Sequence, residues 1–352
     1  MPFKTFLVKF FVIFFIQIST FCLSQELSPI SPENGLIINN DSILMRWNTL
    51  ANAQYYELKF TSDSNFISNI TTINVGLQNA YWLTPLLSNT TYYWRIEGNN
   101  GANTEIGQTR KFTNFKPTDF SGCNLWLRAD TGITLVGSKV QGWADASPNL
   151  FAINQTTVNY QPTFLPNYIN GLPALKFDGG DLLTVDNFPY GATVQGFIIC
   201  RKPSPVTPNC QYLTGPNFNF EIINYYCSVE LTVGLVGIFS SLKWNQISLI
   251  RKSGASKANL NGVEFGTTSI GVNPISPGKM TIGNRDLALN ASAGLQGEIS
   301  EIVINTSVLN DIQIKTIETY LMDRYTPKLT LGADTNITDN FCPISLNASP
   351  GF

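Results

Sequence analysis

The sequence contains no histidine among its 352 residues. Nucleophilic systems that pair serine or cysteine with a histidine base are therefore excluded, as are zinc sites built on imidazole. Charged residues are also scarce, at 13%, with a net charge of −2 and no run of Lys or Arg. Nucleic acids and anionic membrane surfaces are poor partners for such a chain. An enzyme built from these residues would depend on carboxylate, lysine or tyrosine chemistry.

Residues 1–24 have the pattern of a secretory signal peptide. Two lysines precede the apolar run 10–16, and Cys22 and Ser24 are small residues suited to cleavage before Gln25. The run is too short to span a bilayer comfortably. A lipoprotein anchored through Cys22 is disfavoured because bulky Phe21 precedes it. We therefore expect an exported chain with no membrane insertion after cleavage.

Cysteine is sparse outside this leader, and the sequence has no C-x-x-C pair of the kind that holds metals. Export permits disulfides, but an odd number of cysteines leaves at least one outside any intrachain pair. Cys210 and Cys227 are the preferred pair, since both lie near predicted loop ends. Cys200 lies in an apolar run and is expected to be a small buried residue. The cysteines outside the leader are Cys123, Cys200, Cys210, Cys227 and Cys342.

Residues 26–115 alternate between apolar and polar side chains over the segments 43–47, 55–60 and 91–97. Period two of this kind predicts strands. The order of these strands, with an early Trp and a Tyr-Tyr-Trp-Arg segment, resembles a bacterial fibronectin type III domain. That resemblance implies a β-sandwich that acts as a spacer, and there is no Arg-Gly-Asp sequence to suggest adhesion through integrins. The predicted core residues are Trp47, Tyr56, Leu58 and Trp94.

Pro117 marks a linker at 115–118 to a second unit, which we place at 119–327. Short apolar runs alternate there with Asp, Asn, Gly and Pro clusters between residues 125 and 183, as expected for strands and turns. This stretch resembles the opening of a concanavalin A-like lectin or laminin-G-like domain, which implies a jelly-roll sandwich. A helix is predicted after Asn310 or Asp311, as a plug over one end of the sandwich. Its expected packing residues are Ile314, Ile317, Tyr320, Leu321 and Tyr325.

The sandwich family that this unit resembles also includes glycoside hydrolases, which place two carboxylates on either side of the scissile bond. Glu298 and Glu301 are three residues apart, so alternation along a strand puts them on opposite faces. Ser300 also stands where related glucanases carry Asp. We therefore expect no catalysis, with Glu301 paired at a sheet edge and Glu298 solvated.

Asp178 and Asp181 flank a double-glycine turn, where carboxylates and exposed carbonyls could hold Ca²⁺. Laminin-G-like relatives bind calcium, but through ligands from several loops. The favoured interpretation is that both carboxylates accept N–H groups of the turn, as Asp does in many tight turns. Asp145, beside a Trp, is expected to stabilise a turn in the same way. We expect no required cofactor, and Ca²⁺ is the one metal ion that this turn suggests.

A carbohydrate site would need an aromatic platform, and the aromatic residues on predicted loops and edges have no common face. No ligand-binding residue can therefore be chosen from the sequence. These candidates are Tyr160, Tyr168, Tyr190, Phe218, Tyr225 and Tyr226.

The sequence thus predicts an all-β protein: a fibronectin type III-like sandwich, then a concanavalin A-like jelly roll with one C-terminal helix. Residues 328–352 resemble the start of an immunoglobulin-like repeat that continues in a longer surface chain. The expected function is non-catalytic recognition of a glycan or glycoprotein outside the cell or at a bacterial surface. The alternatives are a structural stalk or adhesin segment without a ligand of its own and, third, a carbohydrate-active hydrolase.

Overall fold

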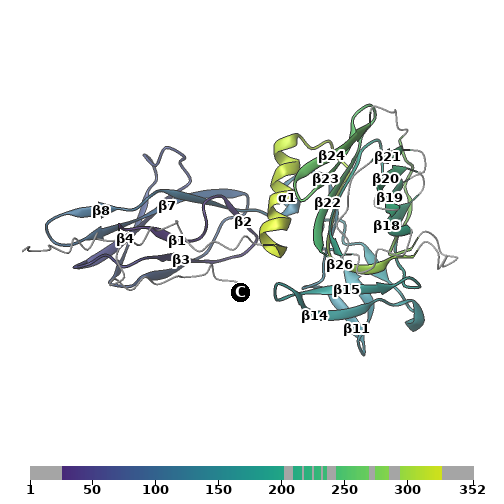
Figure 1. Cartoon of the computed structure of the whole chain (residues 1–352), viewed down its shortest axis with the longest axis horizontal. Coiled ribbons are helices and arrows are strands. Elements are labelled where there is room, and N and C mark those ends of the chain that lie inside the picture. Colours follow the sequence, from purple (N-terminus) through teal and green to yellow (C-terminus); the bar gives the residue numbers. More distant parts are fainter. Residues whose placement is uncertain are drawn as a thin grey trace, which may run out of the picture.

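The computed structural model describes residues 26–201, 209–215, 218–223, 226–230, 233–235, 243–268, 274–284 and 294–326. These residues form two β-sandwiches and the helix α1 (Asp311–Tyr325), which Figure 1 shows between them. The all-β class with one late helix is confirmed. The predicted signal peptide and the tail 328–352 lie outside the described residues.

The first sandwich packs a three-stranded sheet, β1-β3-β6, against a sheet of order β2-β9-β7-β4-β5. In this second sheet β8 pairs with the last residues of β7. The predicted core residues Trp47, Tyr56, Leu58 and Trp94 are all buried between the two sheets, which confirms the period-two prediction. The strands are β1 (Pro29–Ser31), β2 (Leu36–Ile38), β3 (Ile43–Trp47), β4 (Tyr55–Thr61), β5 (Thr71–Gly76), β6 (Ala80–Leu83), β7 (Thr90–Asn99), β8 (Thr104–Ile106) and β9 (Arg110–Asn114).

The second sandwich has two layers. One layer, here called the helix-side sheet, runs β24-β23-β22-β17-β26, and the other edge of β26 pairs with both β10 and β15. The opposite layer contains β12, β13, β16, β25 and β18 to β21. Inward-pointing side chains of both layers form one apolar core. This is the sandwich architecture that the sequence predicts.

The early strands of this unit are β10 (Cys123–Arg128), β11 (Ile133–Val136), β12 (Lys139–Ala144), β13 (Ala152–Asn154), β14 (Thr163–Ile169), β15 (Leu172–Asp178), β16 (Leu183–Phe188) and β17 (Val194–Arg201). The later strands are β18 (Asn209–Gly215), β19 (Phe218–Ile223), β20 (Tyr226–Glu230), β21 (Val233–Leu235), β22 (Trp244–Arg251), β23 (Ser256–Leu260), β24 (Val263–Thr268), β25 (Gly278–Ile282) and β26 (Gln296–Asn305).

Helix α1 begins with a capping box, in which the Asn310 side chain accepts from the Gln313 N–H and the Gln313 side chain accepts from the Asn310 N–H. The predicted packing residues of the helix are all buried. They pack on the outer face of the helix-side sheet. The prediction that the helix covers one end of the sandwich is wrong. Its apolar side chains pack instead on the outward-facing apolar side chains of β17, β22 and β26.

The helix also contacts the first sandwich. The Ile37 N–H of β2 donates to Asp323 Oδ2 at 2.9 Å, and the Ile37 side chain packs on the cluster that α1 covers. The predicted linker belongs to the same cluster, since Phe115 is buried with its ring 4.9 Å from Phe120 and 6.0 Å from Tyr320. A 3-10 helix over Pro117–Asp119 follows. The two sandwiches therefore share a buried joint.

The central strand β26 contains a β-bulge. Its register against β17 shifts between Ile199 and Cys200, and Ile299 and Ile302 both point into the inner core although they are three residues apart. Ser300 is the extra residue, so that Glu298 and Glu301 lie on the same outer face. The prediction that they point to opposite faces is wrong, because strict alternation fails across the bulge.

Cys200 is buried in the inner core, as predicted, and Cys123 is buried on the helix side. The backbone register places Cys210 opposite Ile222 and Cys227 opposite the same Ile222, from the other side of β19. Two strand spacings are about 10 Å, whereas disulfides join Cα atoms about 4.4–6.8 Å apart. The register does not favour the predicted Cys210–Cys227 disulfide, and both side chains lie outside the described residues.

Candidate functional site

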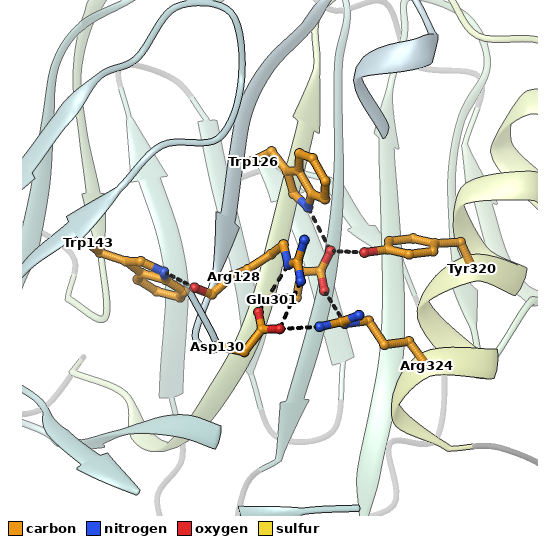
Figure 2. Close-up of polar contacts among 7 residues, drawn as sticks. All are labelled: Trp126, Arg128, Asp130, Trp143, Glu301, Tyr320 and Arg324. Carbon is orange, nitrogen blue, oxygen red and sulfur yellow. Dashed lines mark hydrogen bonds and ion pairs between the residues drawn. The ribbon is translucent and has the colours of Figure 1, made fainter. Parts of the chain in front are cut away.

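Three polar clusters lie on the outer face of the helix-side sheet, two under α1 and one beyond it. The first surrounds the Glu301 carboxylate, which has no solvent exposure. Trp126 Nε1 donates to Glu301 Oε1 at 2.7 Å and the Tyr320 hydroxyl donates to the same oxygen at 3.0 Å (Figure 2). Arg324 Nε lies 3.5 Å from Oε2. Burial raises the pKa of Glu301, while the charge of Arg324 opposes that rise.

Arg324 also pairs with Asp130, which Arg128 binds through two hydrogen bonds of 3.0 and 2.8 Å (Figure 2). Burial would raise the pKa of Asp130, but the hydrogen bond from Arg128 and the charge of Arg324 lower it below its ordinary value. Trp143 Nε1 donates to the Arg128 carbonyl at 2.8 Å and so fixes the backbone at this corner. The cluster joins β10 and β26 to the last turns of α1.

A second buried carboxylate holds the middle of the helix. Glu318 Oε1 accepts from Ser248 Oγ at 2.7 Å and from Asn259 Nδ2 at 2.6 Å, and Gln246 supports Ser248 with a further bond of 2.7 Å. The contact of α1 with the sheet thus combines apolar packing with two hydrogen-bonded carboxylates. Buried polar groups of this kind specify one register and one orientation of a packed helix. The Glu301 cluster therefore has a structural role.

The exposed cluster is a row of four side chains, one from each of four neighbouring strands. Lys176 of β15 pairs with Glu298 of β26, Glu298 pairs with Arg201 of β17, and Arg201 pairs with Trp244 of β22. The strand neighbours of these residues point into the inner core, so the row points outward. We call it the outer row.

Tyr168 of β14 contacts this row, and we include it as the fifth member of the outer row. Its hydroxyl donates to Glu298 Oε1 at 3.3 Å and accepts from Arg201 Nη2. The Arg201 guanidinium lies 5.1 Å from the centre of the Tyr168 ring. The Trp244 and Tyr168 rings pack edge to face, with their centres 6.2 Å apart. Arg201 also binds Glu298 bidentately, through Nε to Oε2 at 3.0 Å and Nη2 to Oε1 at 3.1 Å. Tyr168 is thus held in place while 38% of it remains exposed.

The members of the outer row differ in how much of each side chain is exposed to solvent. The Glu298 side chain is 2% exposed and the Arg201 side chain 25%, while Lys176 is exposed. The hydrogen bond to Glu298 raises the pKa of Arg201 against the opposing effect of its burial. Burial, and then the charge of Glu298, raises the pKa of Tyr168, so its hydroxyl keeps its proton at neutral pH. The expectation of a solvated Glu298 and an edge-paired Glu301 is wrong, because β26 has neighbours on both sides.

The two aspartates of the double-glycine turn bond to the turn itself. Asp181 Oδ2 accepts from the Asp178 N–H at 2.9 Å, and Asp178 Oδ1 accepts from the Gly180 N–H at 2.9 Å. Asp181 is fully buried, and burial raises its pKa to about 7. Asp145 accepts from the Trp126, Ser147 and Phe151 N–H groups, as expected of a turn-stabilising carboxylate.

Across the described residues, no group of three or more His, Cys, Asp or Glu could hold a metal ion. No helix in the described part of the chain is both long and apolar enough to cross a membrane.

The other aromatic candidates do not join the outer row. Tyr160 is exposed on a short 3-10 helix, Val158–Tyr160. Tyr190 lies on a loop after β16, as predicted, but its ring is buried in the inner core and cannot contact a ligand. The side chains of Phe218 and Tyr226, and all of Tyr225, lie outside the described residues. Sequence reasoning named Tyr168 but missed its partners, since their pairing depends on strands far apart in the sequence.

Comparisons with known proteins give no family. No protein-family profile matches the chain, and no curated protein sequence matches it either. Among solved structures, it is similar to domain 4 of an extracellular arabinanase from Geobacillus stearothermophilus in complex with arabinotriose. That match has 14% identity and a TM-score of 0.43, and covers 56% of this chain and 98% of the other.

The receptor-binding domain of botulinum neurotoxin type G matches with 12% identity and a TM-score of 0.43, over 57% of this chain and 52% of the other. A Trypanosoma rangeli sialidase in complex with sialic acid matches with 12% identity and a TM-score of 0.43, over 86% and 55%. The chain thus spans about half the length of these two proteins. Likeness at this level assigns neither a family nor an activity to the chain.

Proposed function

We propose that this chain is a non-catalytic recognition module that binds a glycan at the outer row. The observation that carries the proposal is Tyr168, an exposed ring held in a fixed position by the buried Glu298 and the partly exposed Arg201. Aromatic rings offer a flat apolar face with a polar edge, which matches the alternating C–H and O–H surfaces of a sugar. A ring held rigid before binding loses little conformational entropy when a ligand arrives.

The same face argues against hydrolysis as the function. Glycosidases need two carboxylates that reach the scissile bond. Glu298 and Glu301 share a face, but Glu301 lies beneath Tyr320 and Arg324 without solvent exposure. Glu298 is 2% exposed, and both of its carboxylate oxygens accept hydrogen bonds from Arg201 or Tyr168. Neither carboxylate is open to a substrate in this arrangement.

The strand orders support the finer fold assignments. The facing sheets β1-β3-β6 and β2-β9-β7-β4-β5 fit a fibronectin type III-like spacer, and the two-layered second unit fits a concanavalin A-like module. From these two assignments and the leader-like pattern of residues 1–24, we propose that the protein is exported and attached to the cell surface. In that setting the first sandwich would present the second to ligands outside the cell.

A glycan array probed with the full chain tests the proposed function. Wild type and Tyr160→Ala, a matched control at an exposed tyrosine outside the outer row, are expected to bind the same glycans. Tyr168→Ala is expected to lose that binding, while circular dichroism shows the same fold. Equal binding by Tyr168→Ala, or no glycan bound by wild type, would overturn the proposal. The second result would leave the structural stalk, with its buried joint at α1, as the better account.

A further inference from the structure

The groups that the outer row offers to a ligand are of one kind. Lys176 is exposed and makes no ion pair or hydrogen bond with the described residues. Arg201 uses Nε and Nη2 for Glu298 and Tyr168, and its Nη1 donates to none of the described residues. Both groups are donors only. Beside Arg201 lie the exposed ring of Tyr168 and the half-buried ring of Trp244.

Among the described residues of the outer row, no carboxylate is left free to accept a hydrogen bond. Glu298 contributes the carboxylate of the row, but it is 2% exposed and already accepts three hydrogen bonds, two from Arg201 and one from Tyr168. A neutral sugar presents hydroxyls that both donate and accept, and its donors would find no charged acceptor here. A carboxylate or sulfate group only accepts, and it matches a row whose free groups only donate.

The charge of the row points the same way. Glu298 cancels the charge of Arg201 within a bidentate pair, so the positive charge of Lys176 remains. Lys176 stands on the strand next to Glu298, on the side away from Trp244. A sugar stacked near the aromatic rings can therefore direct an acidic substituent along the row toward Lys176 and the Nη1 group of Arg201.

From this arrangement we propose that the outer row binds an acidic sugar, one that carries a carboxylate or a sulfate, in preference to its neutral counterpart. The inference rests on the proposed glycan-binding function and adds the class of sugar. The acidic group would accept from Lys176 Nζ and Arg201 Nη1, while the sugar ring packs on Tyr168.

The test uses an array on which acidic glycans are printed beside their neutral counterparts: uronates with their methyl esters, sialylated with asialo glycans, and sulfated with desulfated ones. The full chain is expected to bind acidic members at least tenfold more strongly than their partners. The uronate, sialylated and sulfated pairs also show whether the acidic group is a carboxylate or a sulfate. Neutral members bound as strongly as acidic ones would overturn the inference and leave the proposed function standing. No binding to any member would overturn the proposed function itself.

A substitution distinguishes a specific contribution of Lys176 to binding from an effect of the overall surface charge. Lys176→Met keeps the aliphatic stem and removes the charge, and is expected to weaken binding of the acidic glycan about five- to tenfold relative to wild type. The matched control Lys111→Met, at an exposed lysine of the first sandwich, is expected to bind like wild type. Because Lys176 is exposed and makes no ion pair with the described residues, the variant is expected to fold normally. Unchanged affinity of Lys176→Met for the acidic glycan would overturn the inference.

Discussion

The hydroxyl of Tyr320 provides a sharp test of how α1 is held on the sheet. Tyr320→Phe removes one oxygen and keeps the ring against Phe115. The lost hydrogen bond, 3.0 Å long, goes to the buried carboxylate of Glu301, which keeps its contacts with Trp126 and Arg324. A hydrogen bond to a charged group contributes about 1.5–3 kcal/mol. For a unit of this size that is about 3–12 °C in Tm.

The pH dependence of this loss follows from the carboxylate. Burial raises the pKa of Glu301, so the stability that this group contributes falls as pH rises through its folded pKa. The hydroxyl of Tyr320 favours the ionised form, and without it the pKa of Glu301 rises further. The penalty of Tyr320→Phe is therefore expected to grow from acidic to alkaline pH.

Urea unfolding of wild type and variant at pH 5 and pH 9, followed by near-ultraviolet circular dichroism, measures both effects. Tyr160→Phe, which alters an exposed hydroxyl outside this cluster, is the control and should unfold like wild type. A loss below about 0.5 kcal/mol for Tyr320→Phe at both pH values would refute the reasoning, since surface substitutions alone give changes of that size.

Two further predictions concern the turn and the joint. Burial raises the pKa of Asp181 to about 7, so its contribution to stability should fall as pH rises from about 4 to about 7. Asp181→Asn should therefore gain stability relative to wild type between pH 5 and pH 8, by up to about 1.4 kcal/mol per pH unit in urea unfolding; parallel profiles would contradict this. Asp323→Ala removes the acceptor of the Ile37 N–H and should speed hydrogen exchange of that amide at least tenfold, whereas unchanged protection would show that the joint does not depend on this bond.

The sequence was sufficient for the features that depend on local periodicity. Alternation within single strands located Trp47 and Trp94 in the first core, and helical spacing with a capping residue located α1. The features that it could not supply depend on pairing between distant strands. The bulge at Ser300 lies where β26 must change partner on one side, from β15 at Ile299 to β10 at Glu301, while β17 pairs along its other side. No residue near Ser300 signals that requirement.

The outer row could not be predicted from the sequence for the same reason. Glu298 lies 97 residues from Arg201 and 130 from Tyr168 in the sequence, and only the registers of β14, β17 and β26 bring the three together. The apolar run that ends at Arg201 was the one available signal, since a charged residue closing a buried strand often has a partner. The position of α1 also followed from tertiary packing, because an apolar strip on a helix does not specify which surface it covers.

The most direct measurement of the central claim is the affinity of the full chain for an array-identified glycan, compared among wild type, Tyr168→Ala and Tyr160→Ala by isothermal titration calorimetry. Stacking on an aromatic side chain contributes about 1–3 kcal/mol in comparable base–aromatic contacts. The account therefore predicts that Tyr168→Ala weakens binding at least about fivefold, while Tyr160→Ala binds like wild type. Equal affinity of Tyr168→Ala and wild type would contradict it.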